Sequence, residues 1–222
     1  MKQILLLLSI LCGIFFLWEY PILYPLKLLV VFFHESSHAI MTVTTGGEVV
    51  EMLINPQQGG HVLSRGGNRF LTLSAGYLGS LLWGITLYLL AAKSSLDKTI
   101  MRVLAIVVMA IAVLFIRDLF TLAFSLITGV IMLLLASKAH LVVNDLILRV
   151  IGLTSMLYAP LDIVSDTIIR SNLRSDAFML ADEYGGSTLM WGGLWALISI
   201  ALVIVALKMS ISTTSPPPSS SH

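Results

Sequence analysis

Long apolar segments, separated by short polar or glycine-rich stretches, make up most of this chain. The segments cover residues 4–18, 22–44, 70–92, 100–116, 119–137, 141–169 and 191–209. A helix needs about 20 apolar residues to cross a bilayer core, and every backbone polar group inside lipid must be hydrogen-bonded within the protein. The sequence therefore predicts an all-α polytopic membrane protein with six or seven transmembrane helices.

The composition agrees with a multi-pass integral membrane protein. Hydrophobic residues make up 57% of the chain and charged residues 11%, whereas about a quarter of residues are charged in soluble domains. The net charge of +1 provides no basic surplus for binding nucleic acid. Cys12 is the only cysteine, which excludes a cysteine-rich zinc site. We expect residues 1–211 to form one membrane-embedded domain in the lipid bilayer and residues 212–222 to form a disordered Ser/Pro tail.

Two of the apolar segments carry features that should shape helix packing. Ala75, Gly76, Gly79 and Ser80 form a small-residue face, which favours close approach of a neighbouring helix. Pro160 lies inside residues 141–169, where it removes a backbone donor and clashes with the preceding turn. We therefore expect a kink there, or the end of one helix and the start of another, and this choice decides the number of helices.

The most specific chemical pattern is His34-Glu35-Ser36-Ser37-His38, which lies inside the second apolar segment. On a helix, residues four apart face the same side and lie about 6 Å apart along the axis, so both imidazoles can reach one metal ion. Zinc accepts neutral imidazole nitrogen, and the glutamate of such a pattern acts as a general base. Buried polar groups inside a membrane are costly unless they have a partner or a function. The pattern predicts one zinc ion per chain, with His34 and His38 as ligands and Glu35 as the catalytic base.

A catalytic zinc site needs a third protein ligand. His61 and His140 have a suitable side chain, but both lie in polar connecting stretches. Asp162 lies near Pro160 in an apolar setting, where a metal ion would neutralise an otherwise costly carboxylate. We therefore predict Asp162 as the third ligand. Asp166 is one helical turn further on, and remains an alternative ligand or a partner for the free nitrogen of a ligand histidine.

Residues 45–69 are the longest polar stretch, and their Gly-Gly pairs argue against a helix. Residues 48–54 and 61–64 can pair as a short hairpin around the turn signal Asn55-Pro56. A free strand edge beside a metal site can bind an extended polypeptide by strand addition, the alternative being a simple surface hairpin. We predict a Gly-rich, hairpin-like loop whose residues Gly59, Gly60, His61 and Val62 bind substrate.

Taken together, these patterns resemble the site-2 protease family of intramembrane zinc metallopeptidases, in its compact branch without a PDZ domain. The resemblance rests on four stretches: His34-Glu35-Ser36-Ser37-His38, Gly59-Gly60-His61-Val62, Ala75-Gly76-Tyr77-Leu78-Gly79 and Pro160-Leu161-Asp162. In that family two histidines and a distant aspartate, in a Leu-Asp-Gly pattern, bind zinc, and the glutamate activates water. The resemblance implies these roles for His34, His38, Asp162 and Glu35. Ile163 stands where the family has glycine, which keeps Asp166 open as the ligand.

The resulting functional hypothesis is a zinc endopeptidase that cleaves a membrane-protein substrate within or near a transmembrane helix. The alternative is a catalytically silent membrane scaffold that retains the fold. Against the scaffold stands Glu35, because a purely structural metal site needs no base. A metal transporter is a third hypothesis, but transport along a pathway needs a succession of polar sites and the apolar segments carry one cluster.

Overall fold

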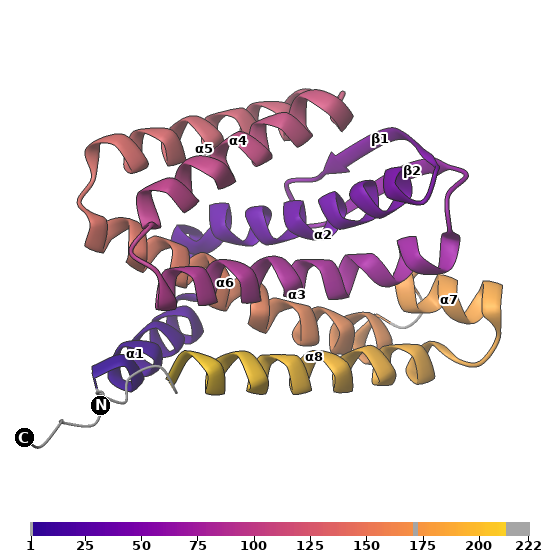
Figure 1. Cartoon of the computed structure of the whole chain (residues 1–222). Coiled ribbons are helices and arrows are strands. Elements are labelled where there is room, and N and C mark those ends of the chain that lie inside the picture. The colour runs from indigo at the N-terminus through magenta and orange to yellow at the C-terminus, as the bar shows by residue number, and fades with distance from the viewer. Residues whose placement is uncertain (1, 171–172, 212–222) are drawn as a thin grey trace, which may run out of the picture.

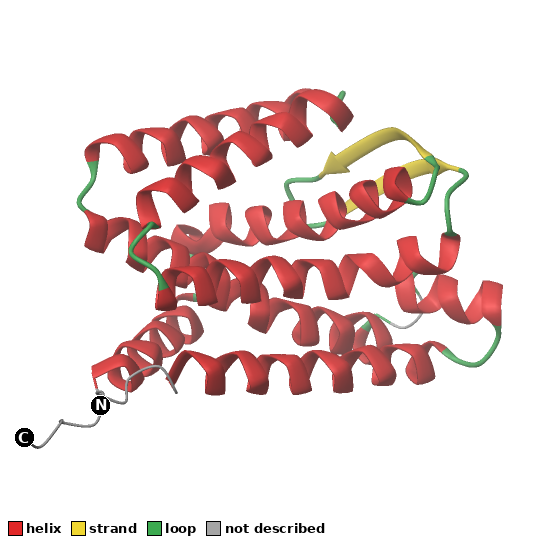
Figure 2. Ribbon diagram, viewed as in Figure 1, coloured by secondary structure: helices red, strands yellow, loops and turns green. Residues whose placement is uncertain are grey.

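The apolar segments form long helices that pack side by side, with one small hairpin at the edge (Figure 1, Figure 2). This computed structural model describes residues 2–170 and 173–211. The helices are α1 (Lys2–Leu17), α2 (Tyr24–Thr44), α3 (Arg69–Lys93), α4 (Asp97–Phe115), α5 (Leu119–Lys138), α6 (Leu141–Val164), α7 (Asp176–Tyr184) and α8 (Thr188–Ile211). A short 3-10 helix, Pro21–Leu23, precedes α2, and a π-helix, Ser165–Ile169, follows α6. The predicted disordered tail, residues 212–222, lies outside the described residues.

Among the described residues, six helices are long and apolar enough to cross a membrane. They are Pro21–Thr44, Arg69–Lys93, Asp97–Phe115, Leu119–Lys138, Leu141–Ile169 and Thr188–Ile211. The first apolar segment of the chain also forms a helix, α1, but it is shorter than these six. The prediction of an all-α, polytopic membrane protein with six or seven spans and a hairpin is confirmed.

Helices α2, α3 and α6 lie between the α4–α5 pair on one side and α8 on the other (Figure 1). The α3–α6 contact is especially close where two glycines meet. A Cβ atom on Gly84 would lie 2.7 Å from the carbonyl oxygen of Gly152, and one on Gly152 would lie 2.7 Å from the backbone nitrogen of Tyr88. These distances leave no room for side chains, so the two backbones are in direct contact.

Pro160 does not end its helix. Helix α6 continues through Pro160 to Val164, and the chain then changes to the wider π-helix, Ser165–Ile169. Residues 141–169 therefore form one membrane span rather than two, which sets the number of spanning helices at six for the described part of the chain. π-Helical turns are rare and occur often at functional sites.

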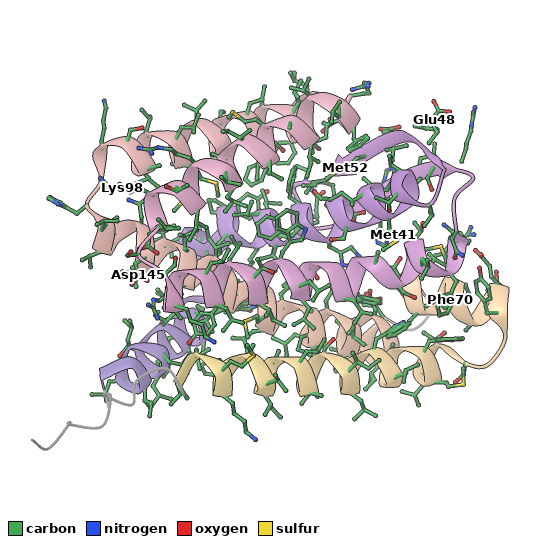
Figure 3. The ribbon with its side chains drawn as sticks, in the orientation of Figure 1. Met41, Glu48, Met52, Phe70, Lys98 and Asp145 are labelled. Atoms are coloured by element: carbon green, nitrogen blue, oxygen red, sulfur yellow. The ribbon has the colours of Figure 1, made fainter. Side chains whose placement is uncertain are left out.

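The Gly-rich stretch forms the predicted hairpin. Strands β1 (Glu48–Ile54) and β2 (Gly60–Arg65) pair antiparallel, with Ile54 opposite Gly60. The other edge of β1 is fixed to the helices: Met52 pairs with Ile116, and the backbone N–H of Ile54 donates to the Thr121 hydroxyl at 2.9 Å. Met52 is fully buried where the hairpin meets the bundle (Figure 3). Because β1 is held on both sides, the outer edge of β2 is the one left for pairing.

Candidate metal centre

The two histidines of α2 point their Nε2 atoms at the same carboxylate. Nε2 of His34 and Nε2 of His38 each lie 3.1 Å from Oδ2 of Asp176. The four-residue spacing produces this arrangement because it places both imidazoles on one side of the helix. In the described part of the chain, this is the one group of three metal-ligating side chains that converges so closely.

Asp176 reaches the histidines because it begins helix α7. The Ser175 side chain caps this helix by accepting a hydrogen bond from the backbone N–H of Phe178, at 3.3 Å. Ala177 and Leu180 are fully buried in a cluster with Leu73 and Tyr77 of α3. The cap and the buried apolar contacts fix the first turn of α7 against α3, so the Asp176 side chain is held at the site.

The hydrogen bonding of His38 suits a metal ligand. Its Nδ1 atom lies 2.7 Å from the carbonyl oxygen of Thr72. A carbonyl oxygen can only accept, so Nδ1 carries the hydrogen, and the Nε2 atom of a neutral ring then presents a lone pair to Asp176. A lone pair and a carboxylate oxygen at this distance repel each other unless a proton or a metal ion lies between them. The donor set of two imidazoles and one carboxylate is one that zinc uses in catalytic sites.

The charge of Asp176 is consistent with this arrangement. Burial alone would raise the pKa of Asp176, but when the histidines are protonated instead of metal-bound, the positive charge on His38 and the hydrogen bonds from both rings outweigh burial and hold its pKa below the ordinary value. The carboxylate is therefore the favoured form of Asp176, which is also the form that binds a metal ion.

Asp162 and Asp166 lie on the opposite side of the His34 ring. Oδ2 of Asp162 is 4.0 Å from Nδ1 of His34, while Oδ1 of Asp162 is 3.4 Å from the Arg170 guanidinium. Arg170 also binds Asp166 at 2.8 Å, and the Tyr77 hydroxyl donates to Asp166 at 2.7 Å. The two aspartates singled out in the sequence thus share one arginine, and Asp162 lies on the Nδ1 side of His34, whereas the Nε2 atoms of both histidines face Asp176.

Sequence reasoning missed Asp176, although one signal pointed to it. Ser175-Asp176 directly precedes an apolar turn, which is a typical helix start. In the sequence, Asp176 belongs to the polar stretch that follows residue 169, and carboxylates in such stretches usually face solvent. The buried packing of α7 against α3 brings it inside, and nothing in the local pattern reports that long-range contact.

Glu35 and the start of the hairpin strand β2 line the same cavity, beside the histidines. The cavity has a volume of about 280 Å³ and is lined by polar groups from α2, the hairpin, the start of α3 and the end of α6. Glu35 is 5% exposed. A Cβ atom on Gly60 would lie 2.6 Å from Oε1 of Glu35, so the first residue of β2 is in direct contact with that side chain. Four loop residues line the cavity: Gly59, Gly60, His61 and Val62.

Comparison with known protein families shows which family the chain belongs to. The family model described as Peptidase M50B-like matches residues 7–206, which is most of the chain. The chain belongs to the Peptidase M50B-like family. The predicted resemblance to the site-2 proteases is confirmed, and no PDZ domain is found. No curated protein and no solved structure matches the chain.

The M50 family consists of zinc metalloproteases. His34, His38 and Asp176 lie close enough together to bind one metal ion. The six apolar helices agree with the family's character as integral, multi-pass membrane proteins.

Proposed function

We propose that this chain is an intramembrane zinc metalloprotease. It hydrolyses peptide bonds within or near a transmembrane segment of a membrane-protein substrate. The observation that carries the proposal is the convergence of two imidazole nitrogens and one carboxylate oxygen beside a buried glutamate. This is the constellation that metal-assisted hydrolysis requires, and it lies in a chain of the M50B-like family.

His34, His38 and Asp176 would hold the zinc ion through Nε2, Nε2 and Oδ2. When bound, zinc supplies a Lewis acid that polarises a carbonyl group and makes water more acidic. Assigning Asp176 as the third ligand replaces the sequence-based choice of Asp162. The support is geometric, because Asp162 faces the other ring nitrogen of His34 and already has the Arg170 guanidinium as partner.

Glu35 is the general base of the proposed reaction. It follows His34 on the same turn of α2 and lines the same cavity as both histidines. A carboxylate in that position can take a proton from the attacking water and return it to the leaving amide nitrogen. Its contact with Gly60 would keep Oε1 inside the cavity.

Asp162 and Thr72 would orient the two ligand histidines. Thr72 accepts a hydrogen bond from Nδ1 of His38, and Asp162 presents a carboxylate to Nδ1 of His34 at 4.0 Å. Partners of this kind fix the ring orientation and the position of the imidazole hydrogen, and they raise ligand basicity. Asp166, which binds Tyr77 and Arg170, would hold this group in place.

The hairpin would hold the substrate in extended form. A peptide bond within a helix is shielded by its own hydrogen bonds, so the segment to be cleaved must unwind before hydrolysis. Gly60, His61 and Val62 of β2 line the cavity together with Gly59, and among the described residues the outer edge of β2 has no strand partner. An unwound substrate segment can pair with this edge by strand addition and so pass beside Glu35.

The proposal is tested by incubating the zinc-loaded protein, in lipid nanodiscs, with a panel of single-span membrane proteins. We expect cleavage products whose new ends lie within or next to the transmembrane segment, as identified by mass spectrometry. Cleavage should disappear on chelation of zinc. Zinc-loaded wild-type protein that leaves every member of the panel intact would favour the catalytically silent scaffold instead.

A further inference from the structure

We propose that Gly76 is a positioning residue of the metal site: its missing side chain provides the space in which the three ligand atoms converge. This inference rests on the proposed zinc-dependent function. The sequence assigned Gly76 to a small-residue face for helix packing, together with Ala75, Gly79 and Ser80. The structure separates Gly76 from that face, because its nearest neighbours are the ligand side chains rather than another helix backbone.

The geometry of Gly76 leaves no room for a methyl group. A Cβ atom built on this residue would lie 2.4 Å from Nε2 of His34, 2.4 Å from Nε2 of His38 and 2.6 Å from Oδ2 of Asp176. Non-bonded carbon atoms do not approach nitrogen or oxygen this closely. Zinc bonds to histidine and carboxylate are about 2.0–2.2 Å long. An alanine methyl would therefore compete with the metal ion for the same three atoms.

Helix α3 cannot move away to relieve this clash. The carbonyl oxygen of Thr72 is bonded to His38 on the ligand side, and that of Ser80 accepts a hydrogen bond from Ser155 of α6 at 2.7 Å. Tyr77, the next residue, is fully buried and is bonded to Asp166. Since the backbone on either side of Gly76 is fixed, the ligand side chains would have to yield.

Gly79 provides the contrast within the same helix. A Cβ atom on Gly79 would lie 2.3 Å from Cβ and Oγ of Ser37, in the packing contact between α2 and α3. Gly84 likewise faces the backbone of α6. These two glycines allow helices to approach each other, whereas Gly76 allows ligand side chains to meet. Replacing Gly76 should therefore affect metal binding more than it affects the fold.

The first test compares zinc affinity in purified Gly76→Ala, Gly193→Ala and wild-type protein, by competition with a metal indicator. Gly193 is the matched control, since it is also inside a helix and a Cβ atom there would have nothing within 4 Å. We expect Gly76→Ala to lose more than about 100-fold in zinc affinity, beyond the range reported for disturbed ligand orientation, while Gly193→Ala binds like the wild type. Wild-type affinity in Gly76→Ala would overturn the inference.

The second test detects the clash without any metal. Gly76→Ala is introduced into the wild type and into a variant carrying His34→Ala, His38→Ala and Asp176→Ala, and all proteins are melted in metal-free detergent solution. We expect Gly76→Ala to lower the melting temperature of the wild type but not that of the triple variant, because the side chains it meets are then absent. An equal decrease in both backgrounds would show a packing role alone and overturn the inference.

The two tests also separate this inference from the proposed function. If the wild-type protein binds zinc no better than the triple variant, the metalloprotease proposal fails. The melting comparison still decides whether Gly76 makes room for the three side chains. Gly60→Ala adds a local comparison, because the three atoms nearest its methyl group would all belong to Glu35 rather than to a ligand side chain. We expect that variant to keep zinc with wild-type affinity.

Discussion

The two ring nitrogens of His34 face two different carboxylate groups. On the Nε2 side, Asp176 lies 3.1 Å from the imidazoles of both His34 and His38. On the Nδ1 side, Asp162 and Asp166 share the Arg170 guanidinium, and Asp166 also accepts a hydrogen bond from Tyr77. The comparison shows that the partners of a buried carboxylate, more than its presence near a histidine, indicate its role. Aspartates neutralised by an arginine suit a supporting role, and an aspartate that faces imidazole nitrogens suits a metal ligand.

The largest effect is expected from Glu35→Gln, in the cavity beside the ligand histidines. This variant keeps the size of the side chain but cannot accept the proton, so we expect the cleavage rate to fall by about 10²–10⁴-fold. The zinc content should stay at the wild-type level, because Glu35 is not among the converging ligand atoms. Cleavage kinetics and elemental analysis on the same preparation check both parts. A normal cleavage rate in this variant would contradict the assignment of Glu35 as base.

A smaller effect is expected on the Nδ1 side, from Asp162→Asn. We expect this variant to keep its zinc but to lose about 10–100-fold in affinity, which is the range for partners that orient ligand histidines. Asp166→Asn is the matched control, since Asp166 is bonded to Tyr77 and Arg170. Metal competition titration measures both variants. A larger loss in Asp166→Asn than in Asp162→Asn would reverse the roles given to the two aspartates.

Tyr77→Phe should act on stability rather than on metal binding. It removes the partly buried hydrogen bond to Asp166, and such bonds contribute about 0.5–1.5 kcal/mol net. For a chain of this length we expect the melting temperature in detergent to fall by roughly 2–4 °C per kcal/mol. The zinc affinity should change little. A loss of zinc comparable to that of a ligand variant would show that the hydrogen bond between Tyr77 and Asp166 is itself needed for zinc binding.

The smallest effect is expected from Arg170→Gln. The Arg170 side chain is 47% exposed, so its ion pairs with Asp162 and Asp166 are partly screened by solvent. Exposed pairs contribute about 0–1 kcal/mol, and we expect a change in melting temperature near the limit of detection. A thermal melt beside Tyr77→Phe provides the comparison. A decrease larger than that of Tyr77→Phe would mean that the two aspartates depend on Arg170 for their charge balance.

The sequence predicted the parts of the molecule that depend on local pattern. The helices follow from the length of the apolar segments, and the hairpin from the glycine pairs and the Asn-Pro turn. The convergence of His34 and His38 follows from helical spacing alone. These features need no knowledge of distant contacts, and the structure contains all of them.

The sequence could not identify the features that depend on contacts between distant segments. Asp162 was chosen because an unpaired carboxylate in an apolar segment is costly, but Arg170 provides its partner once the π-helix forms. Asp176 is 142 residues from His34 along the chain, and it meets the site through the packing of α7 on α3. Gly76 lacks a side chain whether it faces a helix or a metal site, so its role is visible only in three dimensions.

The central claim is that Asp176, with His34 and His38, binds the zinc ion. The most direct measurement is the zinc content of purified Asp176→Ala, compared with Asp162→Ala and the wild type under identical loading. The account predicts about one zinc ion per chain in the wild type and in Asp162→Ala under saturating metal, and none in Asp176→Ala. Full zinc content in Asp176→Ala together with its loss in Asp162→Ala would contradict the account and give the ligand role to Asp162.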